Sequence, residues 1–211
     1  MKITDNHDLN EIDRLVKPAT STMIDRYSFA NHWTKGKTVI DAATGKGYGA
    51  GILLALGAKS VVGIDIDEEG VKDANNLQQS PNCTYQVCDI FKLNENFKEN
   101  EFDVCTSIET FEHLPLERID EYLQSLKYVT KEYIVITTPR RRTKTWEYKG
   151  GTHLYEYDAQ EFIDVLWRNF EECEITAFGL DEIQMPGGQW GTDITTDLDN
   201  CWVFFAVIEL K

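Results

Sequence analysis

The segment DAATGKGYGAG, residues 41–51, follows directly on the apolar run TVI of residues 38–40. Glycine stands at every second position from Gly45 to Gly51. Glycine tolerates positive φ and lets another group approach the backbone without meeting a Cβ atom. An apolar strand, a glycine-rich turn and a helix form the first unit of a doubly wound sheet, whose ligand lies outside the carboxyl ends of the strands. The segment therefore predicts an α/β fold with a ligand site at this turn.

Beyond this segment, apolar runs alternate with stretches of helical period, a pattern typical of βα units on a parallel sheet. The apolar runs predict strands over residues 38–43, 60–65, 83–87, 102–107 and 133–138. The periodic stretches predict helices over residues 48–56, 68–79, 93–98, 116–129 and 159–170, the last one capped by Asp158. Residues 174–179 and 202–209 also read as strands, and because no helix separates them we expect them to pair antiparallel. The connection of residues 180–200 is long, which favours a functional or mobile loop.

The length of 211 residues and an apolar content of 42% predict one folded domain spanning residues 1–211. Residues 1–35 look helical and amphipathic, and we expect them to form an N-terminal helical lid. The five cysteines are scattered and form no C-x-x-C pair, which favours reduced thiols in a cytoplasmic protein. The sequence shows neither a signal peptide nor a membrane span, so no membrane association is expected. The expected assembly is a monomer or a homodimer.

The net charge of −15 disfavours nucleic acid and anionic membrane surfaces as partners. A local exception is the basic run in residues 140–149, which contains Arg140, Arg141, Arg142, Lys144 and Lys149. Such a run is either a solvated loop or a contact for an anionic group of the substrate. The sequence leaves both interpretations open.

Two cofactors are compatible with the glycine-rich turn. Gly45, Gly47 and Ala50 satisfy the dinucleotide pattern G-x-G-x-x-[G/A], and Asp65 follows Gly45 by twenty residues. Asp41 favours S-adenosylmethionine instead, because a carboxylate at the strand end would repel a pyrophosphate but attract a cationic amino group and a sulfonium. A purely structural role, in which Asp41 hydrogen-bonds the loop, stays open.

Carboxylates also follow the next two predicted strands. Asp65 ends its strand and can accept hydrogen bonds from both ribose hydroxyls, each worth about 1.5–3 kcal/mol. Asp67 competes for that role, although it also fits a cap of the following helix. Asp89 stands where an adenine amino group would lie, and Ile66 and Ile90 would cover the ring.

The chain resembles the class I S-adenosylmethionine-dependent methyltransferases, specifically the group with the first motif D-x-x-x-G-x-G-Y-G. The resemblance covers nearly the whole chain and rests on residues 25–30 (DRYSFA), 36–67, 88–91 (CDIF), 102–114 (FDVCTSIETFEHL), 133–139 (YIVITTP) and 152–157 (THLYEY). It implies a Rossmann-like, mostly parallel seven-stranded sheet whose last strand is antiparallel, with helices on both faces. It also implies S-adenosylmethionine as the cofactor, beside Ala43, Gly45 and Gly47. Thr44 departs from the family, which often has cysteine or glycine there, but the contact at that position is mostly made by the backbone.

The same resemblance assigns cofactor contacts outside the turn. Ile108 and Glu109 would lie behind the methionine part of the cofactor. Tyr27 belongs to the N-terminal segment that commonly lids the cofactor in this fold. Its neighbour Arg26 would meet the methionine carboxylate, for which a planar guanidinium is a bidentate partner.

The segment SIETFEHLP, residues 107–115, follows the fourth strand, whose carboxyl end faces the transferring methyl group in this fold. Glu109, Glu112 and His113 are therefore the catalytic candidates. His113 is the expected base if the acceptor is a hydroxyl that has to lose its proton. Alternatively, Glu112 and His113 open the next helix and shape the pocket wall.

The segment GGTHLYEYD, residues 150–158, borders the active-site mouth in relatives. We expect His153 and Tyr155 to contact the substrate, although packed tyrosines and a hydrogen-bonded His153 are an alternative. A metal bound by His153 and Glu156 would need a further ligand that the sequence does not place, so no metal is expected. Arg140 and Trp190 are the other substrate candidates, and Trp190 fits equally well a role in closing the sheet edge.

These features predict an S-adenosylmethionine-dependent methyltransferase that O-methylates a small molecule or a glycan. Methylation of nucleic acid is an alternative in which Arg140, Arg141 and Arg142 contact phosphate, but the Asn/Asp-Pro-Pro-aromatic motif of base-amino methyltransferases is missing. A non-catalytic partner subunit that binds S-adenosylmethionine is another alternative. The sequence does not identify the acceptor.

Overall fold

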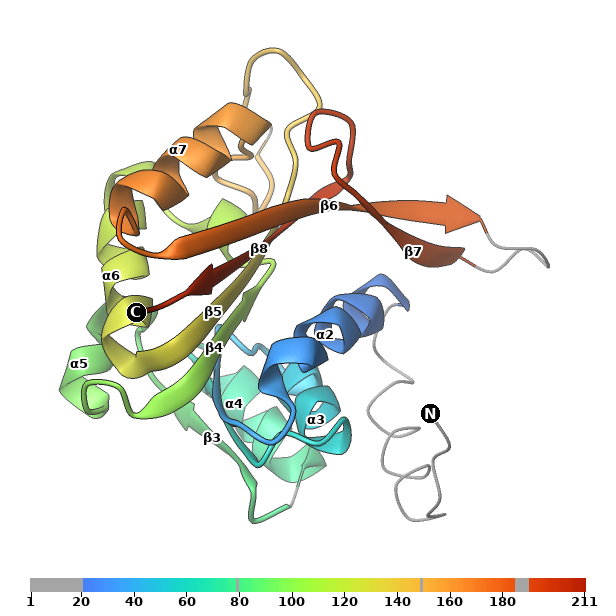
Figure 1. Ribbon diagram of the computed structural model, residues 1–211. Coiled ribbons are helices and arrows are strands. Elements are labelled where there is room, and N and C mark those ends of the chain that lie inside the picture. The colour runs from blue at the N-terminus through green and yellow to red at the C-terminus, as the bar shows by residue number, and fades with distance from the viewer. Residues whose placement is uncertain (1–20, 79, 149, 185–189) are drawn as a thin grey trace.

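The computed structural model describes residues 21–78, 80–148, 150–184 and 190–211, which form an eight-stranded sheet with helices on both faces (Figure 1). The strands are β1 (Thr38–Ala42), β2 (Ser60–Asp65), β3 (Cys83–Val87), β4 (Phe102–Ile108), β5 (Thr130–Pro139), β6 (Glu174–Gln184), β7 (Trp190–Thr195) and β8 (Val203–Glu209). The helices are α2 (Ser21–Thr34), α3 (Tyr48–Ala55), α4 (Glu68–Leu77), α5 (Leu93–Asn96), α6 (Ile119–Val129) and α7 (Ala159–Asn169). Short 3-10 helices lie in the connections: η1 (Ile90–Lys92), η2 (Phe111–His113) and η3 (Leu116–Arg118).

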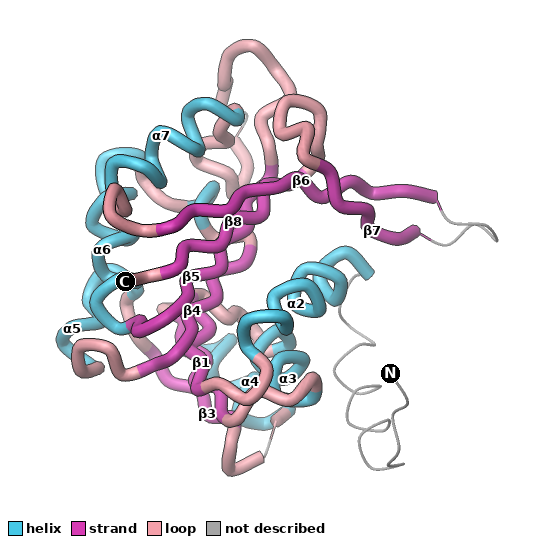
Figure 2. Tube along the Cα trace, viewed as in Figure 1, coloured by secondary structure: helices cyan, strands magenta, loops and turns pink. Residues whose placement is uncertain are grey.

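The strand order is β3-β2-β1-β4-β5-β8-β6-β7. Strands β1 to β5 are parallel, whereas β8 is antiparallel to its neighbours β5 and β6. Figure 2 shows β8 lying between β5 and β6. The predicted antiparallel pairing of the C-terminal strands is confirmed, with Glu174 opposite Glu209 and Gly179 opposite Phe204. The chain order reverses at β1, between β2 and β4, and open α/β sheets bind their ligands at such a switch point. The fold thus points to the carboxyl end of β1 as the ligand site.

The sheet has one strand more than predicted, because part of the expected loop of residues 180–200 forms β7. Strand β6 continues to Gln184, and β7 pairs with it antiparallel from Gly179 opposite Thr195 to Gln184 opposite Trp190. The sequence of β7, WGTDIT, contains only one aliphatic residue and therefore lacks the apolar run that marked the other strands. Its strand conformation depends on the backbone hydrogen bonds to β6, and no local sequence pattern predicts that pairing.

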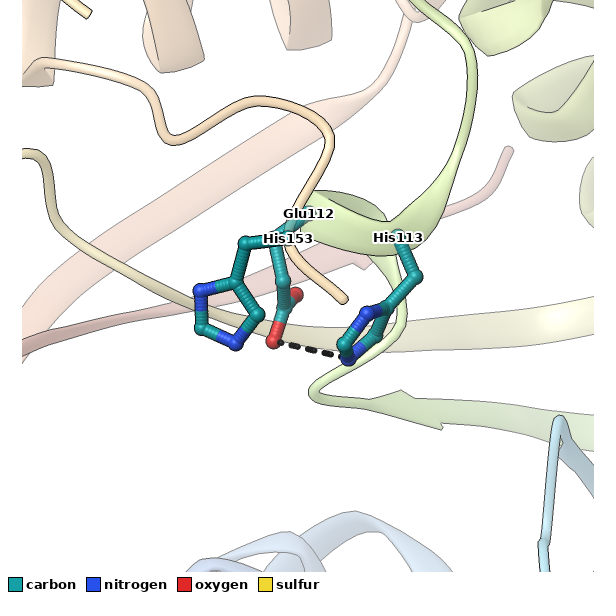
Figure 3. A group of neighbouring side chains, drawn as sticks. All are labelled: Glu112, His113 and His153. Carbon is teal, nitrogen blue, oxygen red and sulfur yellow. Dashed lines mark ion pairs between the residues drawn. The ribbon is translucent and has the colours of Figure 1, made fainter. Parts of the chain in front are cut away.

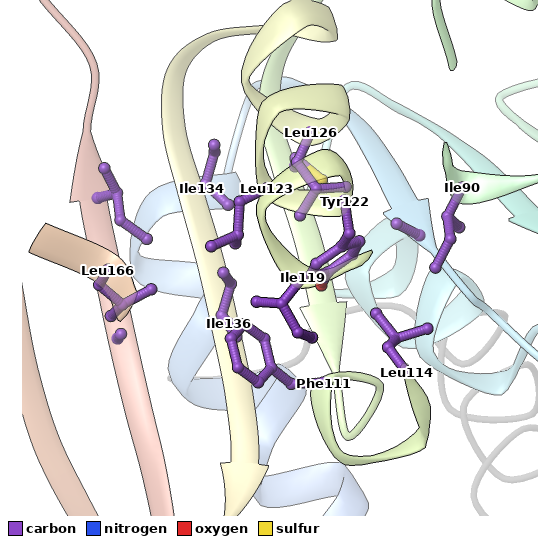
Figure 4. Packing of buried hydrophobic residues seen from close by; sticks show 14 of the residues in the cluster. Ile90, Phe111, Leu114, Ile119, Tyr122, Leu123, Leu126, Ile134, Ile136 and Leu166 are labelled. Atoms are coloured by element: carbon purple, nitrogen blue, oxygen red, sulfur yellow. The ribbon is translucent and has the colours of Figure 1, made fainter. Parts of the chain in front are cut away.

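Apolar side chains form a core on each face of the sheet. On one face, α6 and α7 cover the sheet with Tyr122 and Phe162, and Figure 4 shows how closely α6 packs on β5. On the other face, α2 and α3 supply residues such as Leu53. Successive residues of β8 serve the two cores: Phe204 stacks on Phe162 at 5.0 Å between ring centroids, and Phe205 stacks on Phe178 at 4.7 Å. This alternation follows from the two-residue period of a strand.

The helix predicted within residues 1–35 is confirmed as α2 for Ser21–Thr34, and residues 1–20 lie outside the described residues. Thr192 of β7 donates a hydrogen bond of 2.6 Å from Oγ1 to Oδ2 of Asp25 in α2. The extra strand therefore positions the helix that carries Arg26 and Tyr27. All five cysteines are free thiols, and only Cys173 among them is partly exposed. No described helix combines the length and the apolar character that crossing a membrane requires.

Candidate active site

The glycine-rich turn leads from β1 into α3 with an unusual backbone. Ala43, Gly45 and Gly47 all have positive φ, of 60°, 56° and 78°. A Cβ built on Gly45 would meet no atom within 4 Å, so the backbone there borders open space. A ligand can therefore approach the turn at Gly45. Ala43 adopts the same backbone region in spite of its Cβ, at a strain of about 1–2 kcal/mol.

Two other glycines of the turn make room for the protein's own tyrosines. A Cβ on Gly47 would lie 2.5 Å from the ring of Tyr85, and a Cβ on Gly49 would lie 1.9 Å from the ring of Tyr27. The hydroxyl of Tyr85 also donates a hydrogen bond of 2.9 Å to the carbonyl oxygen of Gly47. The contact between Gly47 and the cofactor stays a prediction, since packing alone accounts for the glycine there.

Asp41 at the end of β1 is completely buried. Its carboxylate accepts hydrogen bonds from Thr44 Oγ1 at 2.6 Å and Thr106 Oγ1 at 2.7 Å, and the hydroxyl of Tyr27 lies 3.3 Å from both oxygens. Burial raises the pKa of Asp41 to about 6, although the hydroxyl donors partly oppose the shift. The sequence expected Asp41 to face a cationic group of the cofactor. In the structure its partners are three hydroxyl groups, and Thr44, the departure from the family motif, is one of them.

Asp65 lies half-buried at the end of β2. Its Oδ2 accepts a hydrogen bond of 2.7 Å from the backbone N–H of Gly45, and its Oδ1 accepts one of 2.9 Å from the backbone N–H of Asp67. Each carboxylate oxygen retains capacity for a further donor. Asp67 instead caps α4 by accepting from the backbone N–H of Glu69, which is the structural alternative that the sequence offered. Of the two candidates, Asp65 is the one attached to the glycine-rich turn.

The apolar and acidic positions after β2 and β3 differ in exposure. Ile66 exposes 70% of its surface next to Asp65, whereas Ile90 is buried in the core. Asp89 caps the short helix η1 by accepting a hydrogen bond of 3.0 Å from the backbone N–H of Phe91. Ile66 is thus available to cover a flat ligand, and Asp89 keeps its second oxygen free of that capping bond.

The end of β4 brings Ile108 and Glu109 to the same edge of the sheet. Ile108 is buried, and Glu109 has a positive φ of 54°. The carboxylate of Glu109 accepts a hydrogen bond of 2.8 Å from Thr137 Oγ1 and lies 3.5 Å from Nη2 of Arg26. Helix α2 and strand β4 therefore place opposite charges side by side at the carboxyl ends of the strands.

Glu112 in η2 is almost entirely buried, with 1% of its surface exposed. Burial and the neighbouring Glu109 raise its pKa to about 8. Its Oε2 accepts a hydrogen bond of 3.0 Å from Thr138 Oγ1, and its backbone carbonyl accepts from the N–H of Leu154 at 2.7 Å. The backbone contact attaches the segment around residue 154 to η2.

This attachment brings His153 to His113, with 5.0 Å between the ring centroids (Figure 3). Nδ1 of His113 lies 2.8 Å from the carbonyl oxygen of Thr152, and Nδ1 of His153 lies 2.7 Å from Oε1 of Glu156. A carbonyl oxygen can only accept, so Nδ1 of His113 carries the proton; the same reasoning applies to His153 opposite the carboxylate of Glu156. Both Nε2 atoms therefore have free lone pairs in the neutral imidazoles.

A pocket of about 840 Å³ opens beside these groups. Its wall includes Arg26 from α2, Glu109 from the end of β4, and His153 and Glu156 from the loop. Arg142 of the predicted basic run also lines it, together with two residues that the sequence did not select, Trp146 and Trp202. The guanidinium of Arg142 lies over the ring of Trp202, 3.0 Å from its centroid. The only sequence feature that could have suggested Trp146 as a pocket residue is its position inside the basic run. No local sequence pattern indicated that the side chain of Trp202 faces the pocket.

The basic run has three different environments in the structure. Arg141 is buried, and its guanidinium forms ion pairs with Asp158 at 2.6 Å and Glu161 at 2.8 Å. Arg140 lines the pocket and donates from Nε to the carbonyl oxygen of Cys201 at 2.7 Å. Arg142 is exposed and also lines the pocket. Only two of the three arginines are therefore placed to meet a ligand there.

Two predicted substrate contacts have other surroundings. The hydroxyl of Tyr155 donates to Glu161 at 2.9 Å and accepts from Arg141 at 2.9 Å, so the side chain belongs to the ion-pair network. Trp190 begins β7, but its side chain lies outside the described residues. The substrate roles of both residues stay predictions.

The strand order, the turn after β1 and the acidic residues at the strand ends define a Rossmann-like α/β fold of the methyltransferase type. Solved S-adenosylmethionine-dependent methyltransferases share it. The protein of Archaeoglobus fulgidus is 17% identical, with a TM-score of 0.70 over 98% of this chain and 100% of its own. The protein of Thermotoga maritima is 12% identical, with a TM-score of 0.68 over 97% of each chain, and that of Aquifex aeolicus is 20% identical, with 0.62 over 95% and 96%.

A family model described as a methyltransferase domain matches residues 33–177. The chain belongs to this family, and it is a methyltransferase. No curated protein matches the chain in sequence.

Proposed function

We propose that the protein transfers the methyl group of S-adenosylmethionine to a hydroxyl oxygen of a small molecule or glycan that carries an anionic group. The observation that carries this proposal is the pocket of about 840 Å³, which begins at Arg26 and Glu109. Its volume is typical of sites for small molecules. A pocket of this kind next to the switch point of the sheet gives an acceptor room beside a bound methyl donor.

The cofactor is S-adenosylmethionine, and the residues around the turn fit it. Gly45 borders open space, Asp65 has hydrogen-bonding capacity left, and Ile66 exposes an apolar side chain next to it. The cofactor would lie against the backbone at Gly45. Asp65 would accept hydrogen bonds from its ribose hydroxyls, and Ile66 would cover its adenine ring. When bound, S-adenosylmethionine supplies an electrophilic methyl group on a positively charged sulfur.

Arg26 and Glu109 are suited to orient the amino-acid end of the cofactor. They lie 3.5 Å apart at the pocket wall and carry opposite charges. The amino-acid end is a zwitterion, so its carboxylate fits the guanidinium and its ammonium fits the glutamate. Orientation of the two reactants can contribute about 7–11 kcal/mol to a transfer of this type.

A hydroxyl acceptor has to lose its proton as it receives the methyl group. The Nε2 atoms of His113 and His153 have free lone pairs, because Nδ1 of each ring holds its proton in a hydrogen bond. A lone pair at this position can accept the proton, or it can bind a cation that makes the hydroxyl more acidic. The lining of the pocket includes His153, which gives it direct access to the acceptor.

The other pocket residues indicate the class of acceptor. Arg140 and Arg142 have no carboxylate partner among the described residues, so both can meet a phosphate or carboxylate of the acceptor. Trp146 and Trp202 also line the pocket, and a sugar or another flat apolar group can pack on Trp146 or on the face of Trp202 that Arg142 does not cover.

The first test is calorimetric titration with S-adenosylhomocysteine and, separately, with NAD. We expect heat with S-adenosylhomocysteine alone. The variant Asp65→Asn should weaken that binding about tenfold or more, a loss of about 1.4 kcal/mol. The matched control is Asp67→Asn, because asparagine caps a helix as well as aspartate does and Asp67 has no bond to the glycine-rich turn. Heat with NAD alone would exclude the proposed cofactor site, and equal affinities of both variants would exclude the role of Asp65.

The second test is transfer of a labelled methyl group from S-adenosylmethionine to fractions of a metabolite extract. Once an acceptor is found, Arg142→Ala should raise its KM several-fold and leave the affinity for S-adenosylhomocysteine unchanged. Cofactor binding without transfer to any fraction would favour the non-catalytic partner subunit instead.

Methylation of nucleic acid is less well supported than it was by sequence alone. Arg141, the central residue of the basic run, is turned inward to Asp158 and Glu161. Arg140 and Arg142 still line the pocket, but the net charge of the protein, −15, repels the phosphates of a nucleic acid. Tight binding to RNA or DNA that falls steeply with salt would overturn this assessment.

A further inference from the structure

Glu112, His113 and His153 form a cluster of potential metal ligands at the edge of the pocket. One ligand atom from each residue lies within 4.8 Å of the others (Figure 3). The sequence offered His153 together with Glu156 and lacked a third ligand. The structure supplies a different set, because η2 and the segment of residues 152–155 pack together across about forty positions of the chain.

We propose that Glu112, His113 and His153 form a binding site for a divalent first-row metal ion. Two imidazoles and one carboxylate are the protein ligands of many zinc sites and of non-haem iron sites with open coordination positions. Ligand atoms lie about 2.0–2.2 Å from such an ion, so the three side chains have to approach one another by about 1 Å. Rotation of the two imidazoles, each more than a third exposed, can supply this movement.

The orientation of both imidazoles suits metal binding. A metal-bound histidine usually donates its other ring N–H to a carbonyl or carboxylate, which fixes the tautomer that binds the ion. His113 makes this contact with the carbonyl oxygen of Thr152, and His153 makes it with Glu156. Both Nε2 atoms are consequently the free ones, and Figure 3 shows them directed toward the carboxylate of Glu112.

The carboxylate of Glu112 is the anionic ligand that such a site requires. It is buried, and its Oε1 lies 3.7 Å from Nε2 of His113, which is too long for a hydrogen bond. No arginine or lysine among the described residues forms an ion pair with it. A buried carboxylate without a cationic partner is costly to ionise, and a metal ion would provide the missing charge.

An ion at this site would lie at the edge of the substrate pocket, because His153 belongs to both. Three protein ligands leave coordination positions open for an oxygen of the acceptor. An ion there would orient the acceptor and lower the pKa of its hydroxyl. This role rests on the proposed function, whereas the metal site itself does not depend on it.

The test is titration of chelator-treated protein with Co²⁺, followed by its visible absorption, and displacement by Zn²⁺. We expect one Co²⁺ per chain with the absorption of a nitrogen- and oxygen-ligated ion, lost when one equivalent of Zn²⁺ is added. His113→Ala and His153→Ala should each weaken Co²⁺ binding about tenfold or more, and Glu156→Gln should weaken it less. His32→Ala is the matched control, since His32 packs on Trp33 in α2 and should leave Co²⁺ binding unchanged.

The folding of each variant is checked by its affinity for S-adenosylhomocysteine, which should match that of the parent protein. Glu112→Gln should also weaken Co²⁺ binding. His153 is partly exposed, so its replacement keeps the core intact even if the variant of the buried Glu112 does not fold. No stoichiometric Co²⁺ binding, or equal binding by the parent and both histidine variants, would overturn the metal site. Protein that binds S-adenosylhomocysteine but not Co²⁺ would retain the proposed function, and protein that binds Co²⁺ but not S-adenosylhomocysteine would retain only the metal site.

Discussion

At the scale of single residues, the glycines of the turn after β1 have two different physical roles. Gly45 has a positive φ and borders open space. At Gly49, the ring of Tyr27 from α2 occupies the space that a side chain would need. The same residue type therefore serves ligand access at one position and internal packing at another. Substitutions at the two glycines should therefore differ in their effects: replacement of Gly49 should mainly lower stability, and replacement of Gly45 should lower the affinity for the cofactor.

Gly49→Ala should destabilise the protein by about 1–3 kcal/mol or more, because its Cβ would lie 1.9 Å from the ring of Tyr27. Urea unfolding measures this loss. Tyr27→Ala opens the space, so the double variant should be more stable than the sum of the two single effects predicts. Additive effects would contradict the packing role.

Gly45→Ala is the matched comparison. Nothing lies within 4 Å of the added Cβ, so stability should fall only by the cost of a left-handed alanine, about 1–2 kcal/mol. The affinity for S-adenosylhomocysteine should fall in this variant, because the methyl group enters the space that we assign to the cofactor. Unchanged affinity in calorimetry would remove Gly45 from the site.

The buried carboxylate of Asp41 makes stability depend on pH. Its pKa of about 6 in the folded protein lies above the ordinary value of 3.8, so folding favours the neutral form. Its contribution is greatest below about pH 4, declines as the pH rises to about 6 and is then lost, a total of about 3 kcal/mol. Asp41→Asn cannot titrate. The free energy of unfolding of the parent, relative to that of the variant, should therefore decline from pH 4 to pH 7. A difference that stays constant over this range would contradict the raised pKa.

Residue type and position were predictable from the sequence at this scale, but surroundings were not. The carboxylates of Asp41 and Asp65 were expected at strand ends and are found there. The partners of Asp41, however, include Thr106, which is 65 positions away, and Tyr27 on a different helix. Likewise, the meeting of Glu112 with His153 depends on a loop that returns to η2, and no local pattern encodes that return.

At the scale of elements, helix α7 shows how one side chain joins a helix to the basic run. Asp158 caps α7 by accepting from the backbone N–H of Glu161, whose side chain returns the bond to the N–H of Asp158. The other carboxylate oxygen of Asp158 pairs with the buried Arg141 at 2.6 Å. The cap and the ion pair can be separated by substitution.

Asp158→Asn should cost at most about 1 kcal/mol, because asparagine keeps the cap and removes only a partly exposed ion pair. Asp158→Ala should cost about 1 kcal/mol more, since the cap is lost as well. Thermal or urea unfolding of both variants gives the two values. Equal losses would show that the cap adds nothing to stability here.

Local patterns predicted the elements well where they are apolar or periodic. Strands β2 and β3 begin and end at the predicted residues, and α7 starts directly after its predicted cap. Strand β7 was missed because Gly191 and Asp193 interrupt its apolar pattern and its pairing with β6 supplies the structure. Short connections such as η2 were also not foreseen, although they hold the groups of the candidate site.

At the scale of the whole molecule, the hairpin of β6 and β7 reaches α2, the helix that borders the glycine-rich turn (Figure 1). The contact includes the hydrogen bond of 2.6 Å from Thr192 to Asp25. Arg26, the next residue of α2, lines the pocket and faces Glu109. The far edge of the sheet is therefore connected to the site through one helix.

Thr192→Val removes the hydrogen bond to Asp25 and should loosen this connection. The free energy of unfolding should fall by only about 1 kcal/mol, the contribution of one hydrogen bond. Hydrogen exchange should become faster in residues 21–34, and the affinity for S-adenosylhomocysteine should fall several-fold. Ile194→Ala is the control on the same strand, since Ile194 is half exposed. Equal exchange in α2 for the parent and both variants would exclude the coupling.

The distribution of thiols has a practical consequence for following the enzyme at work. Four of the five cysteines are buried and therefore poorly accessible to a maleimide. Burial also raises the pKa of Cys88 and Cys105, and that of Cys201 to about 11, which disfavours their reactive thiolate forms at neutral pH. Cys173 precedes β6 at the end of the sheet opposite the carboxyl ends of β1 to β5. A fluorescent dye should therefore attach there alone, in the natural sequence, and report on the molecule without obstructing the entrance to the pocket.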